Sequence, residues 1–261
     1  MDILIDDLAK AECFAAVFQH LKSLTDSINI SFSEERMYIQ SMDSANVSIV
    51  EISIPAAWFG GYSKVGPGTT VIGVSSGILH RILGSRDKSQ TIALRHVEGE
   101  DTLCAEMRSS VKSVFDKSFE VPLFDLETDL MEIPEIEYQA EMSLPSANFA
   151  GIVNQLKMFG DTMDIECSET NIRLCARSVD QGKMRVDISI DDISAFAIDE
   201  GEELLLSFSL RYMHIICQYC KIADAIELRM SRDFPVRIDY DLGEGARVKF
   251  FLSPKIRSDE D

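Results

Sequence analysis

Residues 119–138 read FEVPLFDLETDLMEIPEIEY and separate two halves of the chain that resemble each other. The stretch contains seven carboxylates and no basic residue. Its apolar residues fit neither a helical nor a strand period, and Pro122 and Pro134 restrict the backbone near its two ends. We interpret it as an extended acidic connector whose apolar side chains lie along the protein surface, the alternative being a plain solvated linker.

The overall composition is that of a globular protein with room for two domains. The chain has 261 residues, of which 46% are hydrophobic and 26% are charged. No run approaches the roughly 20 apolar residues that a membrane span needs, and the first residues, MDILIDDLAK, are acidic where a signal peptide is basic. We therefore expect the protein to stay inside the cell.

Cysteine usage argues against a disulfide scaffold. The six cysteines are scattered, so we expect reduced thiols. Cys217 and Cys220 form the spacing C-x-x-C, but the sequence offers no second pair and no nearby histidine pair to complete a four-ligand zinc site. Packing within a helix is the favoured role for this pair, and the sequence predicts no cofactor and no metal.

Hydrophobic periodicity predicts two helices and many strands in the first half. Apolar residues recur at helical spacing over Leu8–Leu24, and a second helix is expected over Ser76–Arg86. A glycine-rich stretch at 60–68 lacks the Lys-Ser/Thr of a phosphate-binding loop and is interpreted as a turn. The predicted strands cover residues 28–32, 37–41, 47–54, 70–74, 91–97, 102–107 and 111–121.

The second half repeats the first. A shift of 135 positions places Phe14 on Phe149 and Asp26 on Asp161, and a shift of 134 places His80 on His214, each within a block of matches. The fold class that follows is α+β, with two duplicated domains in which helices pack on antiparallel sheets. We expect an N-terminal domain over 1–118, a connector over 119–137, a C-terminal domain over 138–256 and an acidic tail over 257–261.

Charge is distributed unevenly between the predicted helices and the rest of the chain. The formal net charge is −19, yet the four predicted helices, 8–24, 76–86, 146–160 and 208–221, hold seven basic residues and one carboxylate. They carry +6 and the remainder carries −25. A polar helix stripe is commonly just a solvated face, but this partition favours a surface for weak, sequence-independent contact with phosphates. Such a protein must enclose its ligand to retain it.

Several motifs resemble the sliding clamps of the proliferating cell nuclear antigen family. These are Gln40-Ser-Met-Asp-Ser44 with the following 47–50, Leu210-Arg-Tyr212, the ending 249–256 (KFFLSPKI), and Ile133-Pro134-Glu135 in the connector. The resemblance implies a ring of three identical subunits whose helices line a hole around duplex DNA. The side chains expected to face DNA are Lys10, Lys22, His80, Arg81, Lys157, Arg211, His214 and Lys221.

The resemblance also implies the contacts between subunits. The family pairs the last strand of the first domain with an edge strand of the second, which correspond here to residues 114–121 and 183–188. Head-to-tail contacts of this kind close a ring when the rotation per subunit fits. The expected interface residues are Phe115, Phe119, Met184, Val186 and Ile188.

A third implication is a pocket, between the connector and the C-terminal end, into which client proteins insert a short peptide with apolar and aromatic anchors. Polymerase, clamp loader, ligase and nuclease clients in the nucleus, or at a viral replication site, are the expected partners. The implied lining consists of Met42, Val47, Ile49, Met131, Ile133, Tyr138, Pro235, Phe251, Ser253, Pro254 and Ile256.

Two alternatives remain open from the residues. A checkpoint-type clamp subunit shares the fold but assembles with different chains. A nuclease could hold a divalent metal through Asp191-Asp192 or Asp239-x-Asp241, yet no motif positions a catalytic lysine, a histidine or a third carboxylate. We therefore favour a non-enzymatic processivity clamp.

Overall fold

The computed structural model describes residues 1–64, 66, 68–126 and 130–256. Two compact units form. The first contains residues 1–44, 50–131 and 242–248, and the second contains 45–49, 132–241 and the chain from 249 onward. Part of the predicted connector, 127–129, and the predicted acidic tail, 257–261, lie outside the described residues, and the predicted domain boundaries stay a prediction.

The first repeat alternates two α-helices with strands in the order β-α-β-β-β-η-β-β-α-β-β-β. Its elements are β1 Asp2–Ile5, α1 Leu8–Leu21, β2 Ser27–Phe32, β3 Arg36–Met42, β4 Ser48–Pro55, η1 Ala56–Trp58, β5 Gly61–Ser63, β6 Thr70–Ser75, α2 Ser76–Gly84, β7 Thr91–Arg95, β8 Thr102–Arg108 and β9 Lys117–Pro122. Strands follow one another as β5-β1-β7-β8-β9 and as β4-β3-β2-β6.

The second repeat has the same order of elements, with one additional 3-10 segment after its last helix. They are β10 Ala140–Pro145, α3 Ser146–Leu156, β11 Thr162–Ser168, β12 Asn171–Ser178, β13 Gly182–Ile188, η2 Ile190–Asp192, β14 Ala195–Ile198, β15 Leu204–Ser209, α4 Leu210–Ile216, η3 Cys217–Lys221, β16 Ala225–Met230, β17 Val236–Asp241 and β18 Arg247–Leu252. Strands follow one another as β14-β10-β16-β17-β18 and as β13-β12-β11-β15, so each strand of one repeat has its counterpart in the other.

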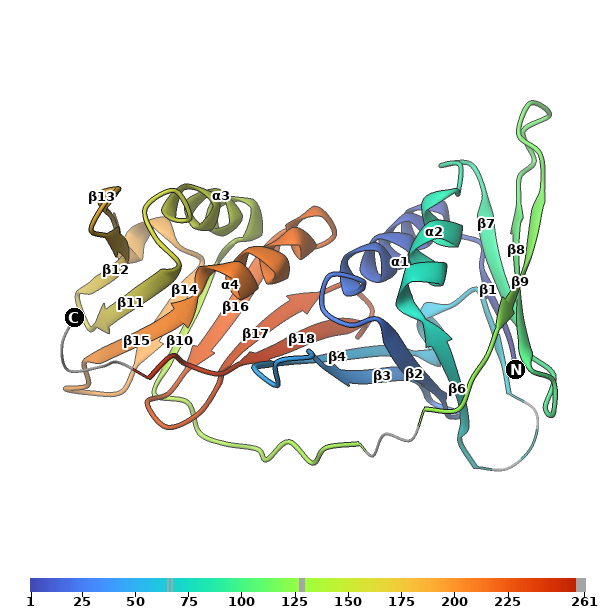
Figure 1. Ribbon diagram of the computed structural model, residues 1–261, viewed down its shortest axis with the longest axis horizontal. Helices are drawn as coiled ribbons and strands as arrows, with labels where there is room; N and C mark the ends of the chain where they lie inside the picture. The colour runs from blue at the N-terminus through green and yellow to red at the C-terminus, as the bar shows by residue number, and fades with distance from the viewer. Residues whose placement is uncertain (65, 67, 127–129, 257–261) are drawn as a thin grey trace. The chain divides into compact units, whose positions relative to one another are not determined.

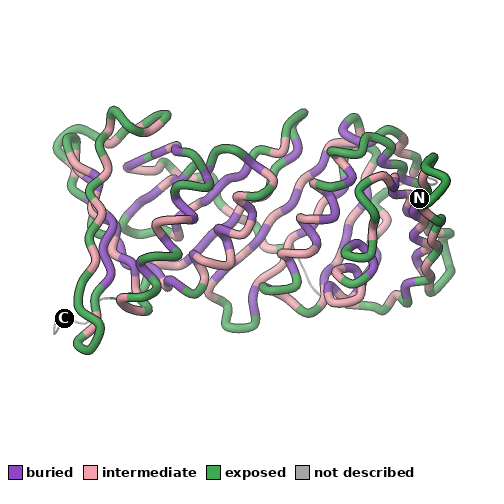
Figure 2. The backbone as a smooth tube through the Cα atoms, turned by 90° about the horizontal axis from the view of Figure 1, so that it is seen from above, coloured by how far each residue is buried: buried purple, intermediate pink, exposed green. Residues whose placement is uncertain are grey.

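Each repeat builds its core between a helix pair and the strands beneath it. In the first unit α1 and α2 lie side by side (Figure 1), and α1 turns Phe14 and Phe18 inward with their ring centroids 4.8 Å apart. Buried and less buried residues alternate along many strands, as the changes of colour along the tube show (Figure 2). In β2, for example, Ile28 and Ile30 are buried and their neighbours are half-buried. This period of two matches a sheet with one face on the core. None of the helices in the described ranges is long and apolar enough to cross a membrane.

Equivalent hydrogen bonds confirm the duplication. The amide of Ser76 at the start of α2 donates to Asp26 O at 3.0 Å, and the amide of Leu210 at the start of α4 donates to Asp161 O at 3.0 Å. These positions are related by the shifts of 134 and 135 found in the sequence. The two repeats therefore join helix to strand through the same backbone contact.

Several predicted boundaries were wrong. The four α-helices end earlier than expected, at Leu21, Gly84, Leu156 and Ile216, and the last continues only as the 3-10 segment η3. Residue 208 belongs to β15 and not to a helix. Two short strands, β1 and β5, were not predicted. They are only four and three residues long and pair with each other, so the long-range pairing and not the local pattern defines them.

The strand predicted over 111–121 begins only at Lys117. Ahead of it the chain forms a turn, in which Val114 N donates to Val111 O at 3.0 Å and Ser109 N donates to the Asp116 carboxylate at 3.1 Å. Asp116 thus satisfies a backbone amide that a strand ladder would otherwise use. Phe115 consequently lies outside β9, although it was expected to share a strand face with Phe119.

Candidate nucleic-acid interface and peptide-binding surface

Exposed cations stand at the C-terminal ends of helices in both units. Lys22 is the C-cap residue of α1 and Lys157 the C-cap residue of α3, and the shift of 135 makes them equivalent. Lys221 is the last residue of the 3-10 segment η3, whose C-cap is Ile222. A cation at a helix C-terminus interacts favourably with the helix dipole, which gives these lysines a structural reason to be there. All three side chains remain exposed and able to meet a phosphate.

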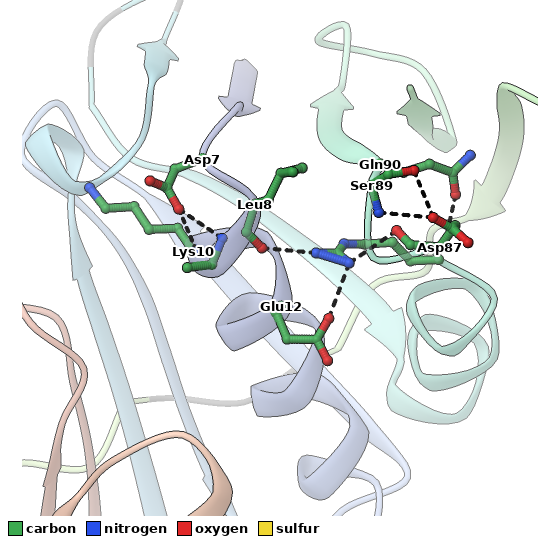
Figure 3. A network of polar contacts seen from close by, with 9 residues as sticks. Asp7, Leu8, Lys10, Glu12, Asp87, Ser89 and Gln90 are labelled. Carbon is green, nitrogen blue, oxygen red and sulfur yellow. Dashed lines mark hydrogen bonds and ion pairs between the residues drawn. The ribbon is translucent and has the colours of Figure 1, made fainter. Parts of the chain in front are cut away.

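Lys10 differs from the other predicted DNA-facing cations, because its charge is engaged within its own unit. Its Nζ donates to Trp58 O at 2.9 Å and to the Glu244 carboxylate at 2.7 Å, and it lies 5.4 Å from the indole centroid. Asp7 caps the helix by accepting from the amides of Ala9 and Lys10 (Figure 3). The hydrogen bond from the Lys10 amide lowers the pKa of Asp7.

His80 and His214 occupy equivalent places and join the two helices of their own unit. Nδ1 of His80 lies 3.2 Å from Gln19 O, and Nδ1 of His214 lies 2.7 Å from the Asn154 side-chain oxygen. Burial, and then the nearby charge of Lys157, lower the pKa of His214. His214 is therefore neutral near pH 7 and presents a polar group instead of a cation.

Arg86 was counted among the seven basic residues of the predicted helices, but its side chain is buried and cannot contact a phosphate at the surface. Its guanidinium side chain is 2% exposed, pairs with Glu12 at 3.2 Å and donates to Leu8 O at 3.0 Å (Figure 3). Burial lowers its pKa, while Glu12 and Asp87 oppose that effect.

Five predicted DNA-facing cations remain both exposed and without an ion pair to another residue of the described ranges. They come from both helices of each unit, and Arg211 lies 5.9 Å from the ring centroid of its neighbour Tyr212. Sparse cations of this kind support salt-sensitive, sequence-independent contact with phosphates. They are Lys22, Arg81, Lys157, Arg211 and Lys221.

The residues expected to line the peptide pocket are distributed over the two units. Met42 and Met131 belong to the first unit and the other nine to the second. In the second unit Ser253 N donates to Val47 O at 3.0 Å, which brings two of them together. Phe251 is buried, Ile256 is fully exposed, and the rest are half-buried: Met42, Val47, Ile49, Met131, Ile133, Tyr138, Pro235, Ser253 and Pro254.

The two strands expected at the subunit interface are edge strands. β9 ends one sheet and β13 ends another. On β13, Met184, Val186 and Ile188 are half-buried and alternate with exposed residues, whereas Phe119 on β9 is half-buried and Phe115 ahead of it is 82% exposed.

Two other edge strands are already covered, in the same way in both repeats. Phe124 of the connector donates its amide to Gly73 O on β6 at 3.1 Å, and Lys255 of the C-terminal segment donates its amide to Ser207 O on β15 at 2.7 Å. The shift of 134 makes Gly73 and Ser207 equivalent. The remaining end strands, β5 and β14, are only three and four residues long. Among the end strands that the structure describes, β9 and β13 are thus the longest ones whose outer edge makes no backbone bond of this kind.

The carboxylate pairs considered for a nuclease do not assemble into a metal site. Asp239 is buried and paired with Arg237, with 2.8 Å between Nε and Oδ2, so its charge is balanced by the guanidinium. Asp191 and Asp192 lie exposed on η2. Within the part of the chain that the structure describes, no group of three metal-ligating His, Cys, Asp or Glu side chains forms.

The two cysteines of the C-x-x-C spacing lie on the 3-10 segment η3 and not within an α-helix, and Cys220 is half-buried. Cys217 is buried on η3, where burial and the neighbouring Cys220 raise the pKa of its thiol. A thiol that resists ionisation is a poor nucleophile and a poor metal ligand. This environment agrees with a packing role.

The fold and these surfaces define a duplicated α+β protein with cations on its helices and uncovered sheet edges. Two family models match the chain. The model of the proliferating cell nuclear antigen N-terminal domain matches residues 3–130, and that of the C-terminal domain matches residues 132–255. The chain therefore belongs to the proliferating cell nuclear antigen family of DNA sliding clamps, whose members are non-catalytic proteins of DNA replication and repair.

Proposed function

We propose that three copies of this chain close a ring around duplex DNA, and that the ring tethers replication and repair enzymes as a processivity factor. The observation that carries the ring is the pattern of covered and uncovered edges. In both repeats a following segment of the chain bonds to an end strand, at Gly73 on β6 and at Ser207 on β15. The end strands β9 and β13 make no such bond among the described residues. If β9 of each copy paired head-to-tail with β13 of the next copy, both of these edges would be covered in every subunit of a closed ring.

The charge pattern supports DNA as the enclosed ligand. Five exposed cations stand on the helices of a chain whose net charge is −19. Backbone phosphates can meet these cations one at a time, while the acidic remainder repels DNA from other surfaces. Contacts this sparse permit sliding, and topological enclosure then supplies the retention that affinity does not.

The proposed client site consists of the eleven lining residues named above, with Met42 and Met131 as adaptable apolar contacts. Its clients would be polymerase, ligase, nuclease and clamp-loader proteins that carry a short peptide with apolar and aromatic anchors. Such clients place the ring in the nucleus, or at a viral replication site if a virus encodes it.

Topology gives the decisive test. The protein is incubated with nicked circular DNA, unbound protein is removed, and the circle is then cut once with a restriction enzyme. We expect the protein to stay on the intact circle and to leave the linear product. Equal retention before and after cutting would refute enclosure, and a species of 29.2 kDa that assembles only when a different chain is added would favour the checkpoint-type alternative.

A further inference from the structure

One row of side chains across three strands of the first unit holds the connector. Asn29 on β2 is the register partner of Gly73 on β6. Gln40 on β3 follows Ile39, which pairs with Ile30, so Gln40 stands next to Asn29 in the same row. Each member of the row bonds to a different residue among the described parts of the connector, namely Phe124, Leu126 and Met131.

The first two contacts of the row, at Gly73 and Asn29, each hold the connector by a single hydrogen bond. Gly73 O accepts from Phe124 N at 3.1 Å, and the Asn29 side-chain amide donates to Leu126 O at 3.0 Å. At Gly73 the fit is close, since a Cβ there would lie 2.1 Å from Phe124 O. These bonds hold Phe124 and Leu126 in place, but a single hydrogen bond at each residue does not fix the orientation of Met131 further along the connector.

Gln40 makes a different contact, because its side-chain amide bonds to both backbone groups of one residue. Oε1 accepts from Met131 N at 2.7 Å, and Nε2 donates to Met131 O at 3.0 Å. Nε2 also lies 3.4 Å from the Glu51 carboxylate, which favours the orientation with nitrogen on that side. The pair imitates one rung of a β-ladder and fixes both the position and the orientation of Met131.

Comparison with the second repeat shows that the fold itself does not require this amide. The equivalent row there consists of Ser207, Asp164 and Cys175, which are paired across β15, β11 and β12. Cys175 stands at the place of Gln40 and is buried. A thiol cannot offer a matched strong donor and acceptor. The amide at position 40 is therefore a feature of the repeat that carries the connector.

We propose that Gln40 is the positioning residue of the client-peptide pocket, acting by setting where Met131 stands. This inference rests on the proposed function, because Met131 matters for binding only if the pocket takes client peptides. Met42, two residues further along the same strand, is another proposed lining residue of the first unit. Gln40 thus links Met42, on its own strand, to Met131, which its side-chain amide holds by two hydrogen bonds.

The test compares the full-length protein with Gln40→Met, which keeps the side-chain length but removes donor and acceptor, and with Gln155→Met, the same change at an exposed residue of α3. Amide hydrogen exchange is followed at Met131 and Phe124. Binding of a short synthetic peptide with one aliphatic and one aromatic anchor is measured by fluorescence anisotropy, and the mass in solution is measured in parallel.

We expect Gln40→Met to accelerate exchange at Met131 by about tenfold or more and to weaken peptide binding by about three- to tenfold. Exchange at Phe124 and the mass should not change, and Gln155→Met should match the wild type in every measurement. Unchanged exchange at Met131, or faster exchange with unaltered peptide affinity, would overturn the role of Gln40. If the wild-type protein itself bound no peptide while Gln40→Met still exposed Met131, the proposed pocket would be the part that failed, and the positioning role would fall with it.

Discussion

Replacement of Phe115 by alanine tests the ring most directly. This aromatic side chain is 82% exposed in the single chain, and it lies between the turn at 111–114 and the edge strand β9. Gln90, a buried residue, donates from its side-chain amide to Phe115 O at 2.8 Å and so holds the residue in place. A large apolar side chain held outward in this way is what an interface anchor requires.

The magnitude follows from the exposed fraction. A phenylalanine buries about 200 Å² when it is fully covered, so covering the exposed 82% removes about 160 Å² from water. At about 25 cal/mol per Å² this contributes about 4 kcal/mol to each contact between copies. Because alanine retains part of that area, the expected loss is about 2–3 kcal/mol per contact, which weakens association by about 30- to 150-fold.

Light scattering or mass photometry over a dilution series measures the effect. The wild type should keep a mass near three times 29.2 kDa. Because a ring of three loses this area at each of its contacts, Phe115→Ala should dissociate at a protein concentration at least about 30-fold higher than the wild type does. Val97→Ala is the matched control, since Val97 is also an exposed apolar residue, at 59%, but lies between β7 and β8 outside the proposed interface. Identical dilution curves for Phe115→Ala and the wild type would refute the assignment of Phe115 to the interface.

Three further predictions concern DNA binding, the connector and pH. Replacing Lys22 and Lys157 by alanine should reduce the slope of log affinity against log salt by about 0.9 for each phosphate that the protein no longer touches, and an unchanged slope on DNA would show that these lysines do not meet phosphates. Gly73→Ala should displace Phe124, because the new Cβ would lie 2.1 Å from its carbonyl oxygen; we expect a decrease of about 1–3 kcal/mol in the free energy of urea unfolding and faster amide exchange at Phe124. His214 has a lowered pKa in the folded protein, so the unfolded chain takes up its proton first and stability should fall as pH drops below about 6.5. His214→Gln should make the urea midpoint less dependent on pH between about 7.5 and 5.5, and an equal pH dependence in both proteins would contradict this.

Much of the fold follows from local patterns. The helix starts at Leu8, Ser76 and Ser146 were predicted as the structure has them, because an amphipathic helix shows its period within a few turns. The duplication was visible from residue identities alone, and equivalent hydrogen bonds at Ser76 and Leu210 confirm it. Elements that form only through distant partners were missed, as β1 and β5 show.

The surfaces were predicted less completely than the elements. The sequence indicated which helices are basic, but it could not show that Lys10 is paired with Glu244 or that Arg86 is buried beside Glu12, because both partners lie far along the chain. For the same reason the pairing of Gln40 with Met131, which lies 91 residues away, had no local signal.

The duplicated plan, the acidic connector, the basic helices and the family motifs are all properties of the amino-acid order, since each is written in the spacing of nearby residues or in a fixed shift along the chain. Folding in three dimensions settled which sheet edges are covered, which cations remain exposed and which side chains hold the connector. Hydrogen bonds and ion pairs depend on distances of about 3 Å between groups that folding brings together. The periodicity of a sequence predicts which face of a helix or strand a residue lies on. Which side chain or backbone group it then bonds to depends on the tertiary structure.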